Sequence, residues 1–114
     1  MASGTVEKFD STDGSTYVKY SNGIIIAFGK ERITTSTYSS NTPFIYRGIK
    51  TKSLGEYGFT SILAAFATPS WVSAAWSNGS ATSIDNSNLS ITLTLGQHDN
   101  ETQPVFWLAI GLWK

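Results

Sequence analysis

The hydrophobic residues of this chain recur at every second position, which is the spacing of β-strands. The clearest case is the segment 88–95, NLSITLTL, in which four aliphatic residues alternate with polar ones. Successive side chains of a strand point to opposite faces, so this pattern predicts a strand with one face on a core and one face in water. Residues 16–20 and 23–30 predict two more strands, joined by Ser21-Asn22-Gly23. Asn-Gly tolerates positive φ at both central turn positions, so we expect a tight hairpin there.

Further strands are expected at 59–67 and 71–77, separated by Thr68-Pro69-Ser70. A helix is the alternative for the first of them, which contains Ala64-Ala65, but the surrounding β-rich sequence favours a strand. Asn78-Gly79 predicts a second hairpin turn, leading into a strand at 80–84. Roughly eight short strands with turns between them predict an all-β, antiparallel β-sandwich.

The last segment, 105–113, reads VFWLAIGLW and is almost continuously apolar. A strand of this kind must be covered on both faces. In a two-layer sandwich only one face of a strand meets the core, so the second face needs another cover. A symmetry-related subunit is the natural candidate. Residues 1–15, MASGTVEKFDSTDGS, are polar and lack any apolar period, so we expect a tether ahead of a single domain at 16–114.

The composition narrows the possible functions. Charged residues make up 14% of the 114 residues and the net charge is zero, while the chain has 16 Ser and 14 Thr. The absence of any Lys/Arg cluster argues against a nucleic-acid partner, and no apolar run is long enough for insertion into a membrane. With no Cys and a single His, thiolate metal sites and disulfides are excluded, and we expect no metal or other cofactor.

Catalysis is not indicated by any motif, so we expect that the protein is not an enzyme. The eight acidic residues are scattered, whereas a glycosidase needs two carboxylates facing each other. A Ser–His–Asp site would have to use His98, beside which Asp99 is poorly placed to orient the ring. A Gly-x-Ser-x-Gly elbow is also missing from the sequence.

The most polar loop between two strong strands is 96–104, GQHDNETQP, and loops commonly carry binding residues. Aromatic rings beside polar side chains are how proteins hold sugars. The candidate receptor or glycan contacts are therefore His98, Asp99, Asn100, Trp76 and Tyr57. The alternative is that Asp99 and Asn100 merely form the turn and that the aromatic residues are core.

Three stretches together resemble the C-terminal tip domains of phage tail fibres and receptor-binding proteins. They are 17–29 (YVKYSNGIIIAFG), 66–74 (FATPSWVSA) and 106–114 (FWLAIGLWK). The family pattern has a Y-x-K-x-x-x-G-x-I-I hairpin, then a Pro after an apolar strand, then a final W-x-A-I-G strand. The matching residues are Tyr17, Lys19, Gly23, Ile24, Ile25, Pro69, Trp107, Ala109, Ile110 and Gly111.

The C-terminal pattern is also similar to the H-type lectins, which are antiparallel sandwiches that assemble as trimers and bind galactose-type sugars. The resemblance implies a homotrimer in which residues 1–15 are a shaft remnant and 16–114 the tip domain. In those lectins a Trp-His pair and an Arg contact the sugar. In this chain the corresponding pair is Gln97-His98, so the His is present and the Trp is not, and the strand at 71–77 has no Arg. The sugar preference of those lectins therefore does not carry over.

The function implied by the resemblance is recognition of a host cell-surface receptor, expected to be a glycan, by the trimeric tip of a fibre. The fibre would be assembled in the bacterial cytoplasm and the domain would lie at its tip in the virion. The alternative is a structural cap that trimerises and binds nothing. An enzyme that trims surface polysaccharide comes third, because fold does not decide among these.

Overall fold

The computed structural model describes residues 6–12, 15–39, 42–69, 77–96 and 102–114. Within these ranges the chain forms nine strands and one short 3-10 helix. The elements are β1 (Val6–Thr12), β2 (Ser15–Tyr20), β3 (Ile24–Thr34), β4 (Ser36–Ser39), β5 (Thr42–Ser53), η1 (Gly55–Tyr57), β6 (Ser61–Pro69), β7 (Ser77–Ser83), β8 (Asn88–Gly96) and β9 (Thr102–Leu112). No helix in the described ranges is long and apolar enough to cross a bilayer.

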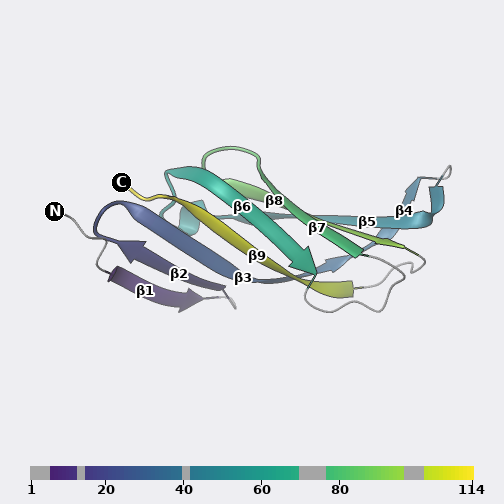
Figure 1. The fold of residues 1–114 in the computed structure, drawn as a ribbon, viewed down its shortest axis with the longest axis horizontal. Coiled ribbons are helices and arrows are strands. Elements are labelled where there is room, and N and C mark those ends of the chain that lie inside the picture. Colours follow the sequence, from purple (N-terminus) through teal and green to yellow (C-terminus); the bar gives the residue numbers. More distant parts are fainter. Residues whose placement is uncertain (1–5, 13–14, 40–41, 70–76, 97–101) are drawn as a thin grey trace.

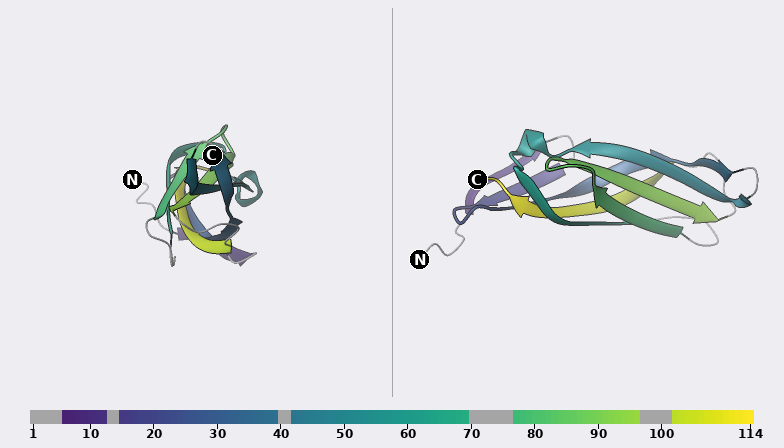
Figure 2. Two further views of the ribbon diagram at one scale, coloured as in Figure 1. Left: turned by 90° about the vertical axis from the view of Figure 1, so that its right-hand side faces the viewer. Right: turned by 90° about the horizontal axis from the view of Figure 1, so that it is seen from above.

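The strands form two antiparallel sheets that pack face to face (Figure 1). Sheet A has the order β1-β2-β3-β9-β6, and sheet B has the order β4-β5-β8-β7. The sandwich is long and narrow, with extents of 55 × 23 × 21 Å, and both sheets run along its length (Figure 2). The expected all-β, antiparallel sandwich is therefore confirmed.

The hairpin between β2 and β3 is confirmed, but its central turn residues are Ser21 and Asn22, and Gly23 follows them rather than occupying the second central position. Gly23 has φ of 96°, and its amide donates a hydrogen bond of 3.0 Å to the carbonyl oxygen of Tyr20. The Asn22 side-chain oxygen accepts a further bond from the Ile24 amide at 3.1 Å. A positive φ is the conformation that Gly adopts at little cost, which is why the turn forms at this residue.

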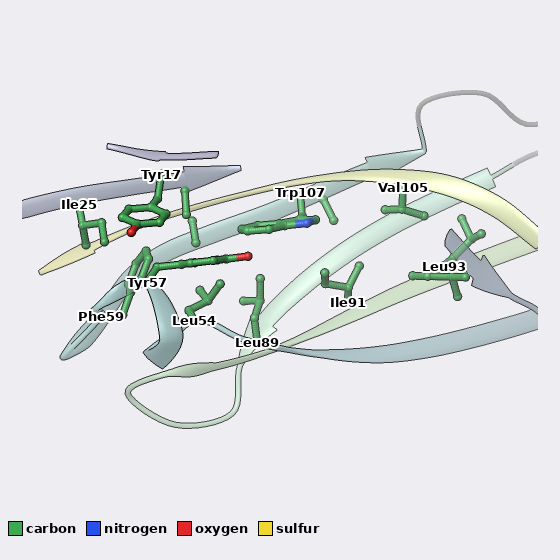
Figure 3. Packing of buried hydrophobic residues seen from close by; sticks show 14 of the residues in the cluster. Tyr17, Ile25, Leu54, Tyr57, Phe59, Leu89, Ile91, Leu93, Val105 and Trp107 are labelled. Atoms are coloured by element: carbon green, nitrogen blue, oxygen red, sulfur yellow. The ribbon is translucent and has the colours of Figure 1, made fainter. Parts of the chain in front are cut away.

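The alternating segment at 88–95 becomes β8, in the interior of sheet B. Its aliphatic side chains are all fully buried and form the sheet B side of the core: Leu89, Ile91, Leu93 and Leu95. Opposite them, sheet A contributes Ile25, Val105 and Trp107 (Figure 3). Each such side chain contributes about 1.5–3 kcal/mol by leaving water, so this inner face accounts for much of the stability.

The apolar C-terminal segment becomes β9, which lies between β3 and β6 in sheet A. Its inward positions are buried, from Gln103 through Trp107 to Gly111. Its outward positions, among them Leu108 and Ile110, are only partly covered. The expectation that one face of this strand meets the core is confirmed, and its outer face is partly covered within the described residues.

Two local expectations differ from the structure. Asn78-Gly79 does not form a turn but lies within β7, where Gly79 faces β6; a Cβ there would come within 3.0 Å of the Pro69 side chain. The glycine therefore allows two sheet edges to approach closely, and the turn lies after Ser83 instead. In addition, residues 6–12 of the expected tether form β1, which pairs with β2 at the edge of sheet A. The division between a shaft remnant and a tip domain stays a prediction.

Candidate functional site

The loop that the sequence singles out joins the two sheets at one end of the sandwich. It leaves sheet B after Gly96 and enters sheet A at Thr102, whose hydroxyl is 2.6 Å from that of Thr34 on β3. Of the predicted receptor contacts, His98, Asp99 and Asn100 lie in this loop, and Trp76 precedes β7. All four lie outside the described residues, so their role stays a proposal.

The register of the strands shows where the flanks of these segments meet. Ser77, which follows Trp76, pairs with Leu95 on β8, three residues before His98. Pro69, at the end of β6, pairs with Val105 near the start of β9. The segments that contain Trp76 and His98 therefore begin and end at the same end of the sandwich, although they are far apart in sequence.

Tyr57, the fifth predicted contact, lies elsewhere. It is 2% exposed, and its ring stacks on that of Tyr17 with a centroid distance of 5.0 Å (Figure 3). Tyr57 belongs to the 3-10 turn at the start of β8, whereas the 96–104 loop follows the end of β8. The Leu54 amide, just before this turn, donates a hydrogen bond of 2.6 Å to the carbonyl oxygen of Ser87. Because a ring this deeply buried offers a ligand almost no surface, we leave Tyr57 out of the proposed site. From sequence alone, an aromatic residue such as Tyr57 is equally consistent with a place in the core and with a place in a binding site.

The outer face of sheet A is apolar across neighbouring strands. Ile26 on β3 pairs with Ile110 on β9, and Phe28 pairs with Leu108. Leu108 also pairs with Phe66 on β6, which is 52% exposed. The apolar face consists of Val18, Ile24, Ile26, Phe28, Leu63, Ala64, Phe66, Phe106, Leu108, Ile110 and Leu112. Leu63 and Phe66 are 58% and 52% exposed, whereas the other large residues of this face are partly covered by their neighbours. The charged residues Lys30 and Arg32 continue the same face toward the far end of β3.

The outer face of sheet B has the opposite character. The outward residues of β8 are short and polar, and they alternate with its buried aliphatic residues: Asn88, Ser90, Thr92 and Thr94. The flanking strands add Ser80 from β7, which pairs with Thr92, and Arg47 from β5, which pairs with Thr94. None of the outward residues of sheet B whose side chains are described is acidic. This face therefore carries mainly short hydroxyl-bearing side chains, with the exposed Ile49 and the half-buried Ile45 and Arg47 of β5 among them.

A shallow hollow of about 280 Å³ lies on this polar face. It is lined by Ile45, Arg47, Ser80, Thr92 and Thr94, which come from three adjacent strands. The hollow exists because short Ser and Thr side chains on β8 and β7 lie beside the longer Arg47 and Ile45 of β5. Sequence reasoning missed this site because Arg47 and Thr94 are 47 residues apart and meet only through the register of β5 and β8.

Among the described residues, no three His, Cys, Asp or Glu side chains gather in a group that could hold a metal ion. Asp85 instead closes the β7–β8 turn. Its carboxylate accepts bonds from the Asn88 side chain at 2.9 Å and from the backbone amides of Ser87 and Asn88, each at 2.9 Å. These bonds, that of the Asn88 side chain first, lower the pKa of Asp85 from its ordinary value. Asp85 is thus a turn-forming residue.

Comparison with known proteins supports the fold. No protein-family model and no curated protein sequence matches the chain. The structure is similar to the C-terminal part of the R1 pyocin fibre of P. aeruginosa, with a TM-score of 0.59, 14% identity, and coverage of 92% of this chain and 28% of that chain.

Two further solved structures are also similar. An N-truncated R1-type pyocin tail fibre has a TM-score of 0.55, 14% identity, and coverage of 94% of this chain and 84% of that chain. An N-truncated R2-type pyocin tail fibre has a TM-score of 0.55, 12% identity, and coverage of 94% of this chain and 36% of that chain. The chain thus spans well under half of two of the three structures. Identities this low show similarity of fold alone, and that fold is the one found in C-terminal regions of pyocin tail fibres.

Proposed function

We propose that this chain is the tip domain of a phage-type tail fibre, which assembles as a homotrimer and recognises a host cell-surface receptor, a glycan. The observation that carries the proposal is the fold similarity to a pyocin fibre over 92% of this chain. The three short motifs at 17–29, 66–74 and 106–114 support it independently, because they come from the sequence and not from the fold.

The apolar outer face of sheet A supports the homotrimer. Exposed apolar surface costs about 25 cal/mol per Å² relative to burial, so chains that cover this face in one another gain stability. A second copy of this chain is a natural cover, since the same apolar surface is present on each copy. The H-type-lectin-like assembly belongs to this proposal.

The receptor contacts proposed from the sequence are His98, Asp99, Asn100 and Trp76. Their flanking residues meet at one end of the sandwich, which supports a common site there. A rigid trimer would present three such sites, and three weak contacts to one cell surface gain avidity without any new interaction. In the virion the domain would lie at the fibre tip, joined to the rest of the fibre.

The alternative is a structural cap, which would trimerise through the same apolar face and bind nothing. An enzyme acting on surface polysaccharide is the third possibility, and we propose no catalytic residue for it.

The test uses the full chain labelled with a fluorophore. It is applied to a glycan array and to a panel of bacterial strains, with light scattering to give its mass. A trimeric mass together with saturable binding to a subset of strains or glycans is expected. A trimer that binds no strain and no glycan would contradict receptor recognition and favour the cap. A monomer at micromolar concentration would contradict the assembly.

A further inference from the structure

The chain contains two Asn-Gly dipeptides, Asn22-Gly23 and Asn78-Gly79, and the fold holds them in different ways. In such a dipeptide the glycine nitrogen can attack the carbonyl carbon of the Asn side chain. Glycine favours this step, because it has no Cβ to crowd the nitrogen and its backbone rotates easily. The dipeptides are chemically the same, so a difference in their reactivity has to come from the structure around them.

Asn22-Gly23 is held by three hydrogen bonds. The side-chain oxygen of Asn22 accepts one from the Ile24 amide at 3.1 Å. The Gly23 nitrogen donates the second to the carbonyl oxygen of Tyr20 at 3.0 Å, and the Gly23 carbonyl oxygen accepts the third from the Trp113 amide, also at 3.0 Å. Gly23 is itself buried. Rotation of this peptide into a reactive geometry would disturb these bonds, so the site is protected.

Asn78-Gly79 lies in β7, a strand with little buried surface. Among the strands whose side chains are described throughout, namely β2, β3, β6, β7, β8 and β9, only β7 has no buried residue. It also lies at the edge of sheet B, beside β8. Local opening costs least where few apolar side chains are buried. We therefore expect β7 to open more readily than the β2–β3 hairpin, which buries Tyr17, Ile25 and Ala27.

The reacting atoms of Asn78-Gly79 are also less restrained. The Ile84 amide donates to the carbonyl oxygen of Asn88 at 2.9 Å, and hydrogen-bonded pairs alternate along an antiparallel ladder. By this register Asn78 bonds to its partner Thr94, whereas the amide of Gly79 points away from β8. Asn78 is exposed, and neither its carboxamide nor the Gly79 amide has a hydrogen-bond partner in the part of the chain that the structure describes.

We propose that Asn78 is a site of spontaneous deamidation and that Asn22 is protected from it. The Gly79 nitrogen loses its proton and bonds to the side-chain carbonyl carbon of Asn78. The bond from that carbon to the side-chain nitrogen breaks, and the nitrogen leaves with the proton as ammonia. Water then opens the resulting succinimide ring at either of its carbonyl groups. The product is aspartate or, where the main chain now runs through the side-chain carbon, isoaspartate.

Both products change the outer face of sheet B. Asn78 faces outward beside Thr94, so a carboxylate at this position adds a negative charge to a face whose described outward residues include no acid. Isoaspartate also lengthens the main chain by one carbon, which disrupts the pairing with Thr94. The modification should therefore loosen β7 as well as charge it. This inference does not depend on the proposed function.

The test is to age the folded full chain at mildly alkaline pH and to map the products by mass spectrometry. Cleavage after Lys and Arg gives the peptide 20–30, in which Asn22 is the only Asn, and cleavage after Trp76 gives a separate peptide with Asn78. Deamidation should be at least about tenfold faster at Asn78 than at Asn22, the ratio that a difference of about 1.4 kcal/mol in opening free energy produces. Equal rates, or a faster rate at Asn22, would overturn the proposal.

The chain unfolded in guanidinium chloride is the control for the effect of sequence. Both dipeptides should react there at similar rates, and faster than Asn78 reacts in the folded chain, because no fold restrains them. If Asn78 stayed tenfold faster than Asn22 in the unfolded chain, its neighbours in sequence would determine its reactivity and the structural inference would fail.

Two matched variants connect the chemistry with its effect on the fold. Asn78→Ser removes the reactive amide from β7, and Asn22→Ser removes it from the hairpin, where Ser is a common turn residue. On ageing, the unmodified chain and Asn22→Ser should form acidic species on ion-exchange chromatography and lose thermal stability, whereas Asn78→Ser should change far more slowly. An Asn78→Ser chain that ages as fast as the unmodified chain would contradict the proposal, and so would protection by Asn22→Ser.

Discussion

The indole N–H of Trp113 donates a hydrogen bond of 2.9 Å to the carbonyl oxygen of Tyr20, across 93 residues of sequence. The Trp113 backbone amide also donates to the carbonyl oxygen of Gly23 at 3.0 Å. The ammonium group of Lys19 lies 5.0 Å from the centre of a Trp113 ring, within the range of a cation–π contact. The last residues of the chain are thus fastened to the β2–β3 hairpin by three separate contacts.

Trp113→Phe should destabilise the fold by about 1 kcal/mol, because it removes one hydrogen bond while an aromatic ring remains. Trp113→Ala should cost more, since the packing of the ring is lost as well. Urea unfolding followed by far-UV circular dichroism measures both. A Phe variant as stable as the unmodified chain would mean that the indole bond contributes nothing.

Ile110→Asp should dissociate the proposed trimer. Ile110 lies at the centre of the apolar outer face of sheet A, and an Asp there would place an unpaired charge in a buried interface, which is costly. Thr51→Asp is the matched control, because it puts the same charge on an exposed outward position of sheet B. Light scattering should show a smaller assembly, or loss of folding, for Ile110→Asp and an unchanged mass for Thr51→Asp. A trimer that survives Ile110→Asp places the interface elsewhere.

Gly111→Ala should destabilise the fold by about 3 kcal/mol or more, as overpacking does in a site that cannot relax. A Cβ at this position would collide with the backbone oxygen of Ser61 on β6 and approach the Phe59 ring to 2.8 Å. Gly55→Ala is the control: its Cβ would meet only the Ser87 side chain, at 3.3 Å, so a small effect is expected. Thermal unfolding of the two variants checks the difference, and equal melting temperatures would contradict the close approach.

The Asp85 carboxyl should titrate below its ordinary pKa of 3.8, because the Asn88 side chain and the Ser87 amide donate hydrogen bonds to its charged form. A pKa lowered in the folded state means that these bonds stabilise the turn above the unfolded pKa. That contribution is lost as the pH falls below 3.8 and through the folded pKa. NMR titration of the carboxyl carbon measures the pKa directly. Asn88→Ala should raise it toward 3.8, and Asn86→Ala should not.

The double variant His98→Ala, Asn100→Ala tests the loop proposed as the receptor site. Surface substitutions in a solvated loop usually change stability by less than about 0.5 kcal/mol, so folding and trimerisation should persist. Binding to cells or glycans should fall if the loop makes the contact. Unchanged binding would exclude the loop as the contact site.

Local patterns in the sequence determined a large part of this fold. The period-two alternation of Leu89, Ile91, Leu93 and Leu95 specified a strand with one buried face, and all four are buried. Asn22-Gly23 specified the hairpin, because positive φ is a property of the residue itself. The apolar run that ends the chain specified a strand with an apolar second face. Each of these features depends on residues that are near one another in sequence.

The tertiary structure alone decided where distant residues meet. Asn78-Gly79 has the sequence of a turn but lies within β7. The glycine has no side chain there, which leaves room for the Pro69 side chain of β6. Tyr57 has the residue type of a sugar contact, but stacking on Tyr17 buries it. Arg47 and Thr94 carry no shared signal, yet the register of β5 and β8 makes them neighbours in one hollow. Strand register between distant segments is set by the packing of the whole core, and a local sequence pattern contains only the period of each strand and not its partner.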